Sequence, residues 1–479
     1  MLNMEIILTI IAAVFLIVEV IGILAAFHAV MHTKTSQGAI AWGISLVTFP
    51  WLALPLYAVF GRSKFHGYVL LRHVKDEKIH HIIDQCSINA AEKQIVQENN
   101  SKNEIALTQL ADLPITRFNN SQLLIDGQET FQSIFNSIDA ASDYILIEFF
   151  IIKDDRLGRE LKNRLIQKVR EKVRIYFLYD EIGSHKLPEM YIREMEREGI
   201  FTSAFQTTQG RINRFQLNFR NHRKIVVVDG LCAFVGGHNV GDEYVTGHPK
   251  LGSWRDTHVK VEGPVVQAVQ FCFLEDWYWA TTEVPELNWQ LNKSQGGAEN
   301  TLLIPSGPAD DLETCGLMFT QAINSARERI WIASPYFVPD RQIIGALKLA
   351  ALRGVDVRIL LPEKPDHRTV YLASYSFYPN TLPVGIKLYR YKPGFMHQKV
   401  FLVDSDCAAV GTANLDNRSF RLNFELTLLN FDRTFIDNVE TMLKQDFSES
   451  RLVALEDYSR RWFPFKVAVR LASLLSPIL

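Results

Sequence analysis

A motif of histidine, lysine, aspartate, glycine and asparagine occurs twice in this chain. The first copy is His222-x-Lys224-x4-Asp229 followed by Gly236-Gly237-x-Asn239, and the second is His397-x-Lys399-x4-Asp404 followed by Gly411-Thr412-x-Asn414. Every spacing inside the motif is the same in both copies, which start 175 positions apart. Single residues of these types are common on protein surfaces, but their repetition at fixed spacing indicates an internal duplication. We therefore expect two similar halves whose sites cooperate.

Short apolar runs beside each copy predict where the motif lies in the fold. Residues 225–228 and 400–403 are β-branched and apolar, which is typical of buried strands. The histidine and the lysine enter such a strand two residues apart, so their side chains point to one face of a sheet. A second apolar run leads to Gly237 or Thr412, where the backbone is expected to let a phosphate oxygen approach closely. Each copy thus offers an imidazole, an ammonium group and a carboxamide on one surface.

This set of groups suits phosphoryl transfer without a metal or a cofactor. Lysine and asparagine side chains can neutralise and hydrogen-bond the non-bridging phosphate oxygens, a task that Mg²⁺ performs in other enzymes. One imidazole can attack phosphorus to give a phosphohistidine, while the other protonates the leaving alcohol and later deprotonates the incoming one. Histidine supplies both protonation states near neutral pH. The alternative, two hydrogen-bonded core histidines, leaves the duplication unexplained.

Each half also contains a predicted strand, a helical stretch and a second strand. The strands are expected at residues 144–150 and 173–180 in the first half, and at 329–336 and 354–361 in the second. This order is typical of βαβ units. We predict an α/β fold of two pseudo-symmetric α/β/α domains with mixed, largely parallel sheets and with the motifs between them. Glu148 ends a buried strand, where it either lines the site or binds a backbone amide.

The chain resembles the phospholipase D superfamily, whose hallmark is a paired His-x-Lys-x4-Asp motif. Flanking strings narrow the resemblance to bacterial cardiolipin synthases: Asn221-His222-Arg223-Lys224, residues 235–244, Trp254-Arg255-Asp256, residues 393–399 and residues 414–425. The resemblance covers nearly the whole chain, including its apolar N-terminus. It implies two phospholipase D-type domains in a metal-independent phosphatidyltransferase. Such an enzyme joins two phosphatidylglycerol molecules into cardiolipin and releases glycerol.

The resemblance also implies roles for the motif residues. His222 would be the nucleophile and His397 the general acid and base, although the residues alone leave the reverse assignment open. The phosphate would be held by four side chains: Lys224, Lys399, Asn239 and Asn414.

Four acidic residues accompany the motifs. Asp229 and Asp404 complete the family's catalytic motif, but strand parity puts them on the opposite face or past the strand end, so we expect them to support the structure. Asp256 and Glu425 occupy similar places in the two halves. In the family, acids there hydrogen-bond the motif histidines and fix their tautomers. The alternative for these two is an ordinary surface ion pair.

The first sixty residues predict a transmembrane hairpin. Ile6 to Val30 and Ala39 to Phe60 are apolar stretches that reach the ~20 residues needed to span a bilayer. Two buried core helices are the alternative, and a cleavable signal peptide fits poorly because no basic segment precedes Ile6. Glu19 lies in the first stretch, so it should be neutral or paired within the hairpin or in a homodimer, unless it is a tolerated exception.

Basic residues predict which side of the membrane the chain occupies. Five of them follow the second apolar stretch: Arg62, Lys64, Arg72, Lys75 and Lys78. The connecting loop contains only His32 and Lys34, so the positive-inside rule puts both hairpin ends and the motifs in the cytoplasm. The resemblance implies that the membrane is a bacterial inner membrane. Residues 460–479 are basic, aromatic and amphipathic, which predicts a helix on an anionic leaflet. A helix packed on the core is the alternative.

The remaining composition excludes some classes of function. With 51 basic and 53 acidic residues the chain lacks the basic surplus of a nucleic-acid-binding protein. Its five cysteines are scattered, so they form neither a disulfide framework nor a zinc pattern. The adjacent His80 and His81 would diverge on a helix and are interpreted as surface residues.

These observations give a predicted domain order and a predicted function. The order is a transmembrane hairpin at 1–61, a helical connector at 62–112, two phospholipase D-like domains at 113–295 and 296–459, and a membrane-surface helix at 460–479. The predicted partners are phosphatidylglycerol and other anionic lipids. The motifs do not identify the acceptor alcohol, so a phospholipase D or a phosphatidyltransferase with another donor or acceptor remains an alternative. A membrane-tethered nuclease is less favoured by the neutral charge.

Overall fold

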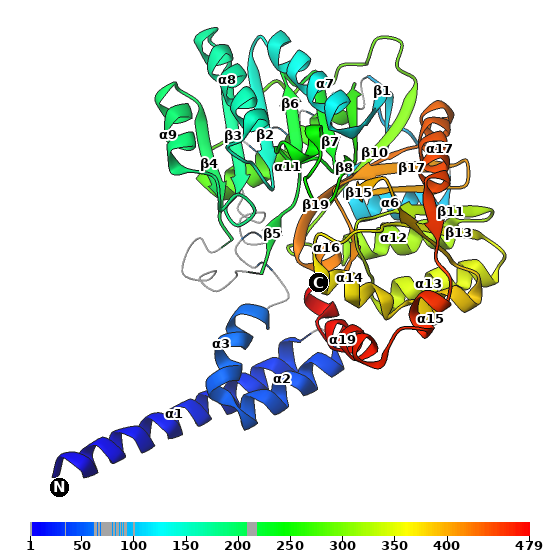
Figure 1. Cartoon of the computed structure of the whole chain (residues 1–479). Coiled ribbons are helices and arrows are strands. Elements are labelled where there is room, and N and C mark those ends of the chain that lie inside the picture. Colours follow the sequence, from blue (N-terminus) through cyan, green and yellow to red (C-terminus); the bar gives the residue numbers. More distant parts are fainter. Residues whose placement is uncertain are drawn as a thin grey trace. The chain divides into compact units, whose positions relative to one another are not determined.

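The structure, a computed structural model, describes residues 2–33, 35–61, 65, 68, 79, 82, 86, 88, 90, 93–98, 101–207 and 218–479. The chain forms two compact units (Figure 1). The helical unit comprises Met1–Leu70 with Thr207–Phe219, and the sheet unit comprises Leu71–Gln206 with Arg220–Leu479.

A long apolar helix, α1 (Leu2–His32), begins the helical unit. Its stretch Ile6–His32 has 27 residues and a mean hydropathy of 3.0. At ~1.5 Å per residue these residues extend roughly 40 Å, more than the ~30 Å hydrocarbon core of a bilayer. Within the described ranges it is the one helix with the length and composition to cross a membrane. The first predicted span therefore matches a continuous helix.

The second predicted span, Ala39 to Phe60, is wrong as a single helix. The chain forms α2 (Ser36–Thr48) and α3 (Pro50–Phe60), which meet at Phe49 with a non-helical φ of −137° and ψ of 57°. Proline disfavours helical backbone at the residue before it, and it is tolerated in a first turn because no N–H is needed there. Pro50 therefore ends one helix and begins the next.

Small residues bring α1, α2 and α3 together. Ala26 and Ala29 of α1 are buried with Leu46 of α2 and Ala53 of α3. A Cβ on Gly22 would lie 2.5 Å from the carbonyl oxygen of Leu46, so this approach requires glycine. The hairpin thus has a straight first limb and a bent second limb.

Part of the predicted N-terminal organisation falls outside the described residues. Glu19 is described and lies partly buried on α1. The basic residues that predict the orientation lie outside, as do both adjacent histidines: Lys34, Arg62, Lys64, Arg72, Lys75, Lys78, His80 and His81.

A 16-stranded sheet forms the centre of the sheet unit. The strand order is β20-β14-β13-β11-β16-β17-β19-β10-β1-β9-β7-β6-β2-β3-β4, with β5 paired to β19. The strands are β1 (Thr116–Ile125), β2 (Tyr144–Phe149), β3 (Arg174–Asp180), β4 (Phe201–Phe205), β5 (Arg220–Asn221), β6 (Ile225–Val228), β7 (Cys232–Gly236), β9 (Thr257–Glu262), β10 (Glu299–Ser306), β11 (Arg329–Ala333), β13 (Asp356–Pro362), β14 (Lys387–Tyr391), β16 (Val400–Val403), β17 (Cys407–Gly411), β19 (Asn423–Asn430) and β20 (Ser450–Leu452). Two further pairs are β8 (Ser253–Arg255) with β15 (Gly394–Met396), and β12 (Phe337–Val338) with β18 (Leu415–Asp416).

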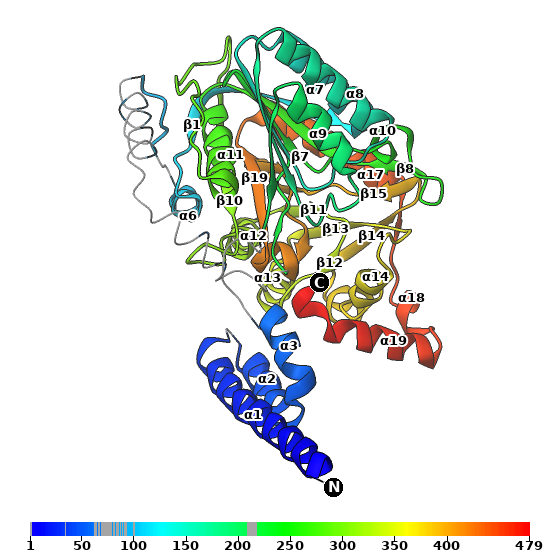
Figure 2. The same cartoon turned by 90° about the vertical axis from the view of Figure 1, so that its left-hand side faces the viewer.

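Helices surround this sheet. They are α6 (Lys102–Ala111), α7 (Asp126–Ala140), α8 (Arg156–Arg170), α9 (Glu189–Arg197), α10 (Glu243–Thr246), α11 (Val265–Thr281), α12 (Thr314–Ser325), α13 (Arg341–Leu352), α14 (Arg368–Tyr375), α15 (Tyr378–Thr381), α16 (Asn417–Arg421), α17 (Arg433–Ser448), α18 (Glu456–Ser459) and α19 (Phe463–Leu474), with 3-10 turns η1 (Leu382–Val384) and η2 (Ser476–Ile478). In the first half α7, α8 and α9 cover one face and α11 the other (Figure 2).

The sheet is mixed, as predicted, and its parallel pairs are confined to particular strands. The βαβ units give the parallel runs β2-β3-β4 and β11-β13-β14. The motif strands pair antiparallel, β6 with β7 and β16 with β17. Each of these pairs is joined by a short turn, which permits only antiparallel neighbours. The predicted α/β class is therefore confirmed, with parallel pairs in the βαβ runs and antiparallel pairs at the motif strands.

The duplicated sequence folds twice in the same way. Ile225 pairs with Val235 in the first half, and Val400 pairs with Val410 in the second, at the same offset of 175 positions. Strand β10 joins the halves because it pairs with β1 on one side and with β19 on the other. The sheet thus continues through both halves, and the predicted boundary at 295/296 falls just before β10 and stays a prediction.

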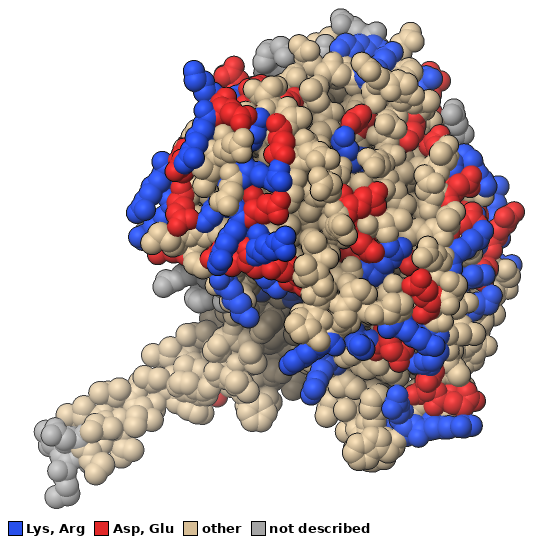
Figure 3. All heavy atoms as spheres, turned by 45° about the horizontal axis from the view of Figure 1, so that its top comes forward, with Lys and Arg blue, Asp and Glu red and all other residues tan. Residues whose placement is uncertain are grey.

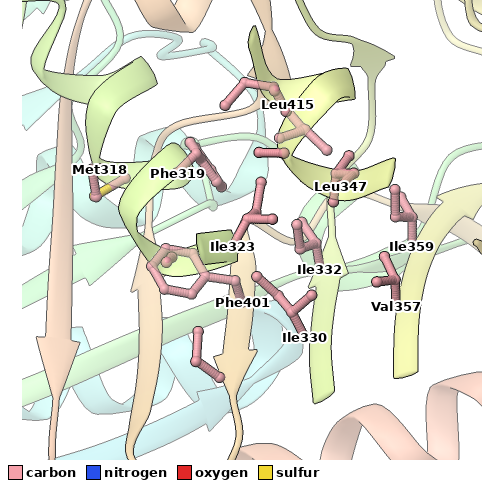
Figure 4. Close-up of a cluster of buried hydrophobic side chains, with 14 of the residues drawn as sticks. Met318, Phe319, Ile323, Ile330, Ile332, Leu347, Val357, Ile359, Phe401 and Leu415 are labelled. Carbon is pink, nitrogen blue, oxygen red and sulfur yellow. The ribbon is translucent and has the colours of Figure 1, made fainter. Parts of the chain in front are cut away.

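Each half packs its own apolar layer against the sheet. In the second half, Phe319 and Ile323 of α12 and Leu347 of α13 lie over Ile332 and Phe401 of the sheet (Figure 4). A separate cluster of buried side chains lies between β2, β3 and α7, α8 and α9 in the first half. On the surface, basic and acidic side chains are interspersed over the visible face of the sheet unit (Figure 3). That pattern shows no continuous basic patch there.

Candidate active site

His222 lies beside Glu425 because a short strand pairing joins the two halves. β5 pairs parallel with β19, with Asn221 opposite Phe424. The main-chain N–H of His222 donates to the carbonyl of Phe424 at 2.9 Å. Glu425 is the next residue of β19, and its Oε2 lies 2.8 Å from Nδ1 of His222. Both side chains are buried.

His397 is held in the same way by the opposite half. β8 pairs parallel with β15, with Arg255 opposite Met396. The N–H of His397 donates to the carbonyl of Arg255 at 2.7 Å, and Asp256 Oδ2 lies 2.7 Å from Nδ1 of the histidine. Each histidine thus contacts a carboxylate that belongs to the other half, and one composite site results.

Three donors hold the carboxylate of Glu425. Thr412 Oγ1 donates to its Oε2 at 2.6 Å, while Ser419 Oγ and Asn423 Nδ2 donate to its Oε1 at 2.8 and 3.0 Å. Burial raises the pKa of Glu425, but His222, Lys224 and these donors outweigh it, and the net pKa is lowered. Thr412 therefore orients the acid, and the approach of a phosphate oxygen to its backbone stays a prediction.

Gly237 makes room for the second acid. A Cβ at this position would lie 2.0 Å from Oδ1 of Asp256, so any other residue would displace the carboxylate. The main-chain N–H of Thr257 donates to the same Oδ1 at 2.8 Å. Burial raises the pKa of Asp256, and Lys399 is the largest opposing influence. The first glycine pair thus supports the acid of its own half, which the sequence interpretation did not foresee.

Pairing at Nδ1 leaves Nε2 of His222 for reaction with phosphorus. Nε2 of His397, the nitrogen expected to transfer a proton, lies 3.0 Å from Nζ of Lys399. Burial lowers the pKa of His222 to about 4, against the opposing influence of Glu425. Burial and the neighbouring Lys399 lower the pKa of His397 well below its ordinary value. Both rings are therefore neutral near pH 7 until a negative charge approaches them. A phosphodiester would shift both groups toward their charged forms.

The motif lysines lie beside the histidines with which they share a strand face. Lys224 Nζ donates to the carbonyl of His222 at 2.6 Å, and Lys399 Nζ donates to the carbonyl of His397. Lys399 Nζ also lies 2.8 Å from Nδ1 of His397. Burial lowers the pKa of Lys224 to about 7 and that of Lys399 to about 8. Glu425 and Asp256 favour the charged form of both lysines and partly offset the effect of burial. A charged lysine at this site can bind an anion.

The two motif asparagines differ in the hydrogen-bond partners of their side chains. Asn239 Oδ1 accepts the N–H of Ile151 at 3.1 Å and its Nδ2 donates to the hydroxyl of Tyr244 at 2.8 Å, so its amide is held by the protein. Asn414 Oδ1 is buried and, within the described part of the chain, has no hydrogen-bond partner. An unpaired amide oxygen accepts a donor and cannot bond a phosphate oxygen, so the role expected for Asn414 falls to its Nδ2 group.

Asp229 and Asp404 lie away from the imidazoles, and each accepts hydrogen bonds from the main chain of a neighbouring turn. Asp229 accepts main-chain N–H groups of Ser142, Asp143 and Tyr144 at 2.8 to 2.9 Å. Asp404 accepts the three equivalent N–H groups, of residues 327–329, at 2.8 to 2.9 Å. Both aspartates have positive φ, 55° and 49°, in the turn after the motif strand. Asp229 and Asp404 therefore support the structure around the motif, as strand parity suggested.

Glu148 lies behind the site. The side-chain amide of Asn221, the residue before His222, donates to Oε1 of Glu148. Burial raises the pKa of Glu148 well above its ordinary value, and Asp276 raises it further. The sequence suggested a backbone amide as one possible partner of Glu148. In the structure its partner is the side-chain amide of Asn221.

Sequence reasoning missed two buried aspartates that anchor the motif strands. Arg223, between His222 and Lys224, pairs with Asp276 of α11 at 2.7 Å. Gln398, at the same place in the second motif, donates to Asp446 of α17 at 3.1 Å. The signal was available, because the middle residue of each motif points to the opposite face and a buried polar group there requires a partner.

The arrangement can bind an anion, deliver a nucleophile and move a proton. Among the described residues, no group of three or more His, Cys, Asp or Glu side chains is placed to hold a metal ion. The buried lysines and Asn414 offer positive charge and hydrogen bonds to phosphate oxygens, next to two imidazoles oriented by carboxylates. These are the parts that phosphoryl transfer through a phosphohistidine requires.

Comparison with known proteins agrees with this chemistry. A family model described as "Cardiolipin synthase, PLD-like domain" matches residues 319–447. The chain is 47% identical over 468 residues to cardiolipin synthase A of Pseudomonas entomophila, and 48% identical to cardiolipin synthase A of Pseudomonas putida (strain GB-1). Each alignment covers 97% of this chain and 97% of the relative.

Solved structures show a similar fold. The phosphatidylserine synthase of Haemophilus influenzae superimposes with a TM-score of 0.58 at 14% identity, over 79% of this chain and 100% of that one. At that identity the likeness establishes the fold alone, which is consistent with the mixed sheet and its flanking helices.

Proposed function

The chain belongs to the cardiolipin synthase family of the phospholipase D superfamily, and from this premise we propose that it transfers a phosphatidyl group from one phosphatidylglycerol to a second one. An enzyme of this family transfers phosphatidyl groups. The identity of both lipids is our proposal. The observation that carries it is the pair of imidazoles, each hydrogen-bonded at Nδ1 to a carboxylate of the opposite half.

In the first step Nε2 of His222 attacks phosphorus and the bond from phosphorus to the glycerol oxygen breaks. His397 gives its Nε2 proton to that oxygen, so glycerol leaves as a neutral alcohol. The low pKa of His222, caused by burial, keeps the attacking nitrogen unprotonated. The bound phosphodiester and Asp256 together favour the protonated form of His397 that this step needs.

In the second step a hydroxyl of another phosphatidylglycerol attacks the phosphohistidine. Its proton passes to His397, the phosphorus–nitrogen bond to His222 breaks, and cardiolipin forms. Lys224, Lys399 and Asn414 balance the negative charge of the phosphate oxygens in both steps. The proton and the histidine return to their starting states.

The proposed location is a bacterial inner membrane with the sheet unit on the cytoplasmic side. The long helix α1 supports membrane association. Insertion of α2 and α3 as a second, bent pass and the homodimer both remain predictions. Donor lipids that reside in the membrane would meet a site attached to it, which favours transfer over hydrolysis by proximity.

Helix α19 supports contact with the membrane surface and also packs on the core. Val469 and Ala472 are buried on one side, while Trp462, Phe463 and Leu474 are 70%, 76% and 74% exposed. A helix that buries one side and exposes large apolar groups on the other suits docking at a lipid interface. The packing on the core that was the alternative is present, and the membrane-surface helix stays a prediction.

Defined lipids test the proposed function. Purified full-length protein is given phosphatidylglycerol alone and the products are identified by mass spectrometry. Cardiolipin and glycerol in equal amounts are expected. Cardiolipin that forms only after phosphatidylethanolamine is added would replace the proposed donor, and phosphatidic acid as the sole product would indicate a phospholipase D.

A further inference from the structure

Each motif asparagine is followed, five residues later, by a side chain with a hydroxyl group. Asn239 is followed by Tyr244 and Asn414 by Ser419, so the two hydroxyls occupy the same place in the two copies, 175 positions apart. Phosphatidyl transfer as proposed gives Tyr244 no role. The two hydroxyls nevertheless make different contacts, and this difference separates the first half from the second.

Ser419 holds the carboxylate of its own half. Its Oγ accepts the main-chain N–H of Asn414 at 3.0 Å and donates to Oε1 of Glu425 at 2.8 Å. The side-chain amide of Asn414 gains no hydrogen bond from this hydroxyl, and its Oδ1 has no partner among the residues that the structure describes. Ser419 therefore does not orient the second amide.

Tyr244 holds the asparagine itself. Its hydroxyl accepts a hydrogen bond from Nδ2 of Asn239 at 2.8 Å, while Oδ1 of the same amide accepts the N–H of Ile151 at 3.1 Å. A main-chain N–H can only donate, so it determines which end of the amide is the oxygen. The first amide is thus held at both ends in one orientation.

The amide of Asn239 lies between the surroundings of the two catalytic histidines. Its oxygen accepts the N–H that directly follows Phe150, whose ring centroid lies 5.0 Å from that of His222. Its nitrogen donates to Tyr244, whose ring centroid lies 6.0 Å from that of His397 at an interplanar angle of 70°. A phosphate that exchanges bonds and protons with both imidazoles has to lie between them, and this amide is placed in the same region.

One hydrogen of this amide is left for such a phosphate. An amide nitrogen carries two hydrogens, and Tyr244 accepts one of them from Asn239. Within the described ranges no acceptor for the other is found, although Asn239 is only 2% exposed. A buried donor without an acceptor costs free energy. A non-bridging oxygen of the substrate phosphate would supply the missing acceptor.

The phenol of Tyr244 is unsuited to proton transfer. Burial raises its pKa well above the ordinary value, and Asp256 raises the pKa further. A phenol this weakly acidic stays neutral near pH 7, so the proton transfers remain with the histidines. The contacts of the hydroxyl instead suit the orientation of Asn239.

Packing holds the ring of Tyr244 independently of its hydroxyl. Its ring centroid lies 5.1 Å from that of Trp254 and 5.7 Å from that of His238. A Cβ on Gly127 of α7 would lie 2.1 Å from the main-chain oxygen of Tyr244, so α7 and α10 are in close contact there. A phenylalanine can therefore fill the same space without the hydroxyl.

We propose that Tyr244 is a positioning residue that fixes Asn239 as a pre-oriented donor to the transferred phosphate. The inference rests on the proposed function, to which it adds a residue. With its amide held at both ends, Asn239 does not have to reorient when negative charge develops on the phosphate oxygens in either step. Ser419 gives Asn414 no such hold, so the two halves contribute unequally to the transition state.

A double-mutant cycle tests this coupling. Purified full-length protein with Tyr244→Phe, Asn239→Ala or both receives phosphatidylglycerol, and glycerol release is measured over a range of lipid concentrations. Asn239→Ala should lower kcat by about 10²-fold, the loss typical of one oxyanion donor. Tyr244→Phe should lower kcat by about tenfold with KM nearly unchanged, because one hydrogen bond that orients the amide is lost. The kcat of the double variant should equal that of Asn239→Ala.

Tyr191→Phe is the matched control. Tyr191 of α9 is also a buried tyrosine of the first half, and its hydroxyl donates to the carbonyl of Gly158 at 2.6 Å. This variant should lose stability and keep the wild-type kcat per folded molecule, with folding followed by differential scanning calorimetry. A Tyr244→Phe protein that loses stability but keeps kcat would overturn the positioning role. So would a further tenfold loss when Tyr244→Phe is added to Asn239→Ala.

Glycerol release separates this inference from the proposed function. Wild-type protein that releases glycerol but forms no cardiolipin contradicts the proposed acceptor, and the cycle still tests Tyr244 because attack on phosphorus comes first. Wild-type protein that releases no glycerol contradicts the proposed donor. The cycle is then run with phosphatidylethanolamine and the release of ethanolamine, and the same ratios are expected because they concern the phosphate and not its alcohol. Additive losses with the donor that reacts would contradict the role of Tyr244.

Discussion

Nδ1 of His222 lies 2.8 Å from Oε2 of Glu425, although 203 positions separate these residues in the sequence. The second histidine repeats the relationship with Asp256 across 141 positions. Each half therefore supplies the imidazole of one pair and the carboxylate of the other. Neither half contains a complete catalytic pair, which explains why the chain needs both copies in one folded unit.

Removal of the orienting charge should slow transfer without unfolding the protein. In Glu425→Gln and Asp256→Asn the side-chain shape is kept, but the carboxylate no longer fixes the imidazole tautomer or stabilises its charged form. We expect turnover to fall by about 10²-fold or more, within the range that general acid–base catalysis contributes. Steady-state assays with circular dichroism as a folding control measure this. Turnover within twofold of wild type in both variants contradicts the orienting role.

The two histidines should differ in the covalent intermediate. His222→Ala removes the proposed nucleophile, so no phosphatidyl-enzyme should form, and turnover should fall by about 10⁴-fold or more. His397→Ala removes the proton donor but leaves the nucleophile, so a slowly formed and slowly cleaved adduct on His222 is expected. Intact-protein mass spectrometry after rapid mixing with short-chain phosphatidylglycerol detects it. An adduct in His222→Ala alone would show the reverse assignment.

Substrate affinity should weaken as the pH rises above neutrality. Burial lowers the pKa of Lys224 from its ordinary value of 10.5 to about 7 and that of Lys399 to about 8. The charged lysine binds phosphate, and its proton is lost as the pH rises through that pKa, so KM for phosphatidylglycerol should increase between pH 7 and 9. A KM that stays constant to pH 10 would contradict buried lysines as the phosphate ligands.

The lowered pKa of Lys224 also distinguishes a loss of substrate affinity from unfolding of the protein. Between pH 7 and 10.5 the unfolded chain still holds the proton that Lys224 has lost in the folded state. Stability rises with pH wherever the unfolded state binds more protons, so the contribution of Lys224 becomes more favourable over this window. A thermal melt at each pH therefore accompanies the kinetic series as its control.

Asp229 should matter for stability rather than for chemistry. Its carboxylate accepts hydrogen bonds from the main chain of Ser142, Asp143 and Tyr144 and from the Ser142 hydroxyl. Asp229→Ala leaves these donors without an acceptor, which should lower the free energy of unfolding by about 3 kcal/mol, given 1–3 kcal/mol for each buried unsatisfied group. Differential scanning calorimetry measures the drop in Tm.

The matched variant for that experiment is Asp437→Asn on the exposed face of α17, where an ion pair contributes little. Turnover per folded molecule of Asp229→Ala should stay near that of wild type at a temperature below its Tm. A large loss of kcat with an unchanged Tm would instead assign Asp229 to the chemistry.

The exposed face of α19 should affect activity on membranes and not in solution. Trp462→Ser, Phe463→Ser and Leu474→Ser combined remove apolar surface while leaving the buried Val469 and Ala472 in place. Turnover on phosphatidylglycerol vesicles should fall about tenfold because each lost apolar side chain weakens interfacial binding. Turnover on short-chain monomeric lipid should be unchanged. Equal losses on both substrates would indicate a role in the fold.

Local chemistry made much of the site predictable. The spacing of His222 and Lys224 on a strand determines that they share a face, and the apolar run after them determines that the strand is buried. Strand parity also indicated that Asp229 turns away from the imidazole. These properties depend on a few neighbouring residues, so they can be read from short segments.

Other features depend on packing that a short segment does not reveal. The apolar composition of residues 39–60 suggested one span, but Pro50 breaks the helix at Phe49. The room that Gly237 makes for Asp256 was not predicted, and its expected approach to phosphate stays a prediction. The antiparallel pairing of the motif strands follows from the tight turn that joins each to its neighbour. Composition alone carries none of this information.

By itself the sequence determined the duplication, the chemical groups of the site and the apolar N-terminus, because each follows from residue type and spacing along the chain. Tertiary structure alone decided that Glu425 serves His222 and Asp256 serves His397, because β5 with β19 and β8 with β15 pair across the halves. It also decided that Tyr244 holds Asn239. Contacts between distant segments depend on register and packing over the whole sheet, which no local pattern encodes.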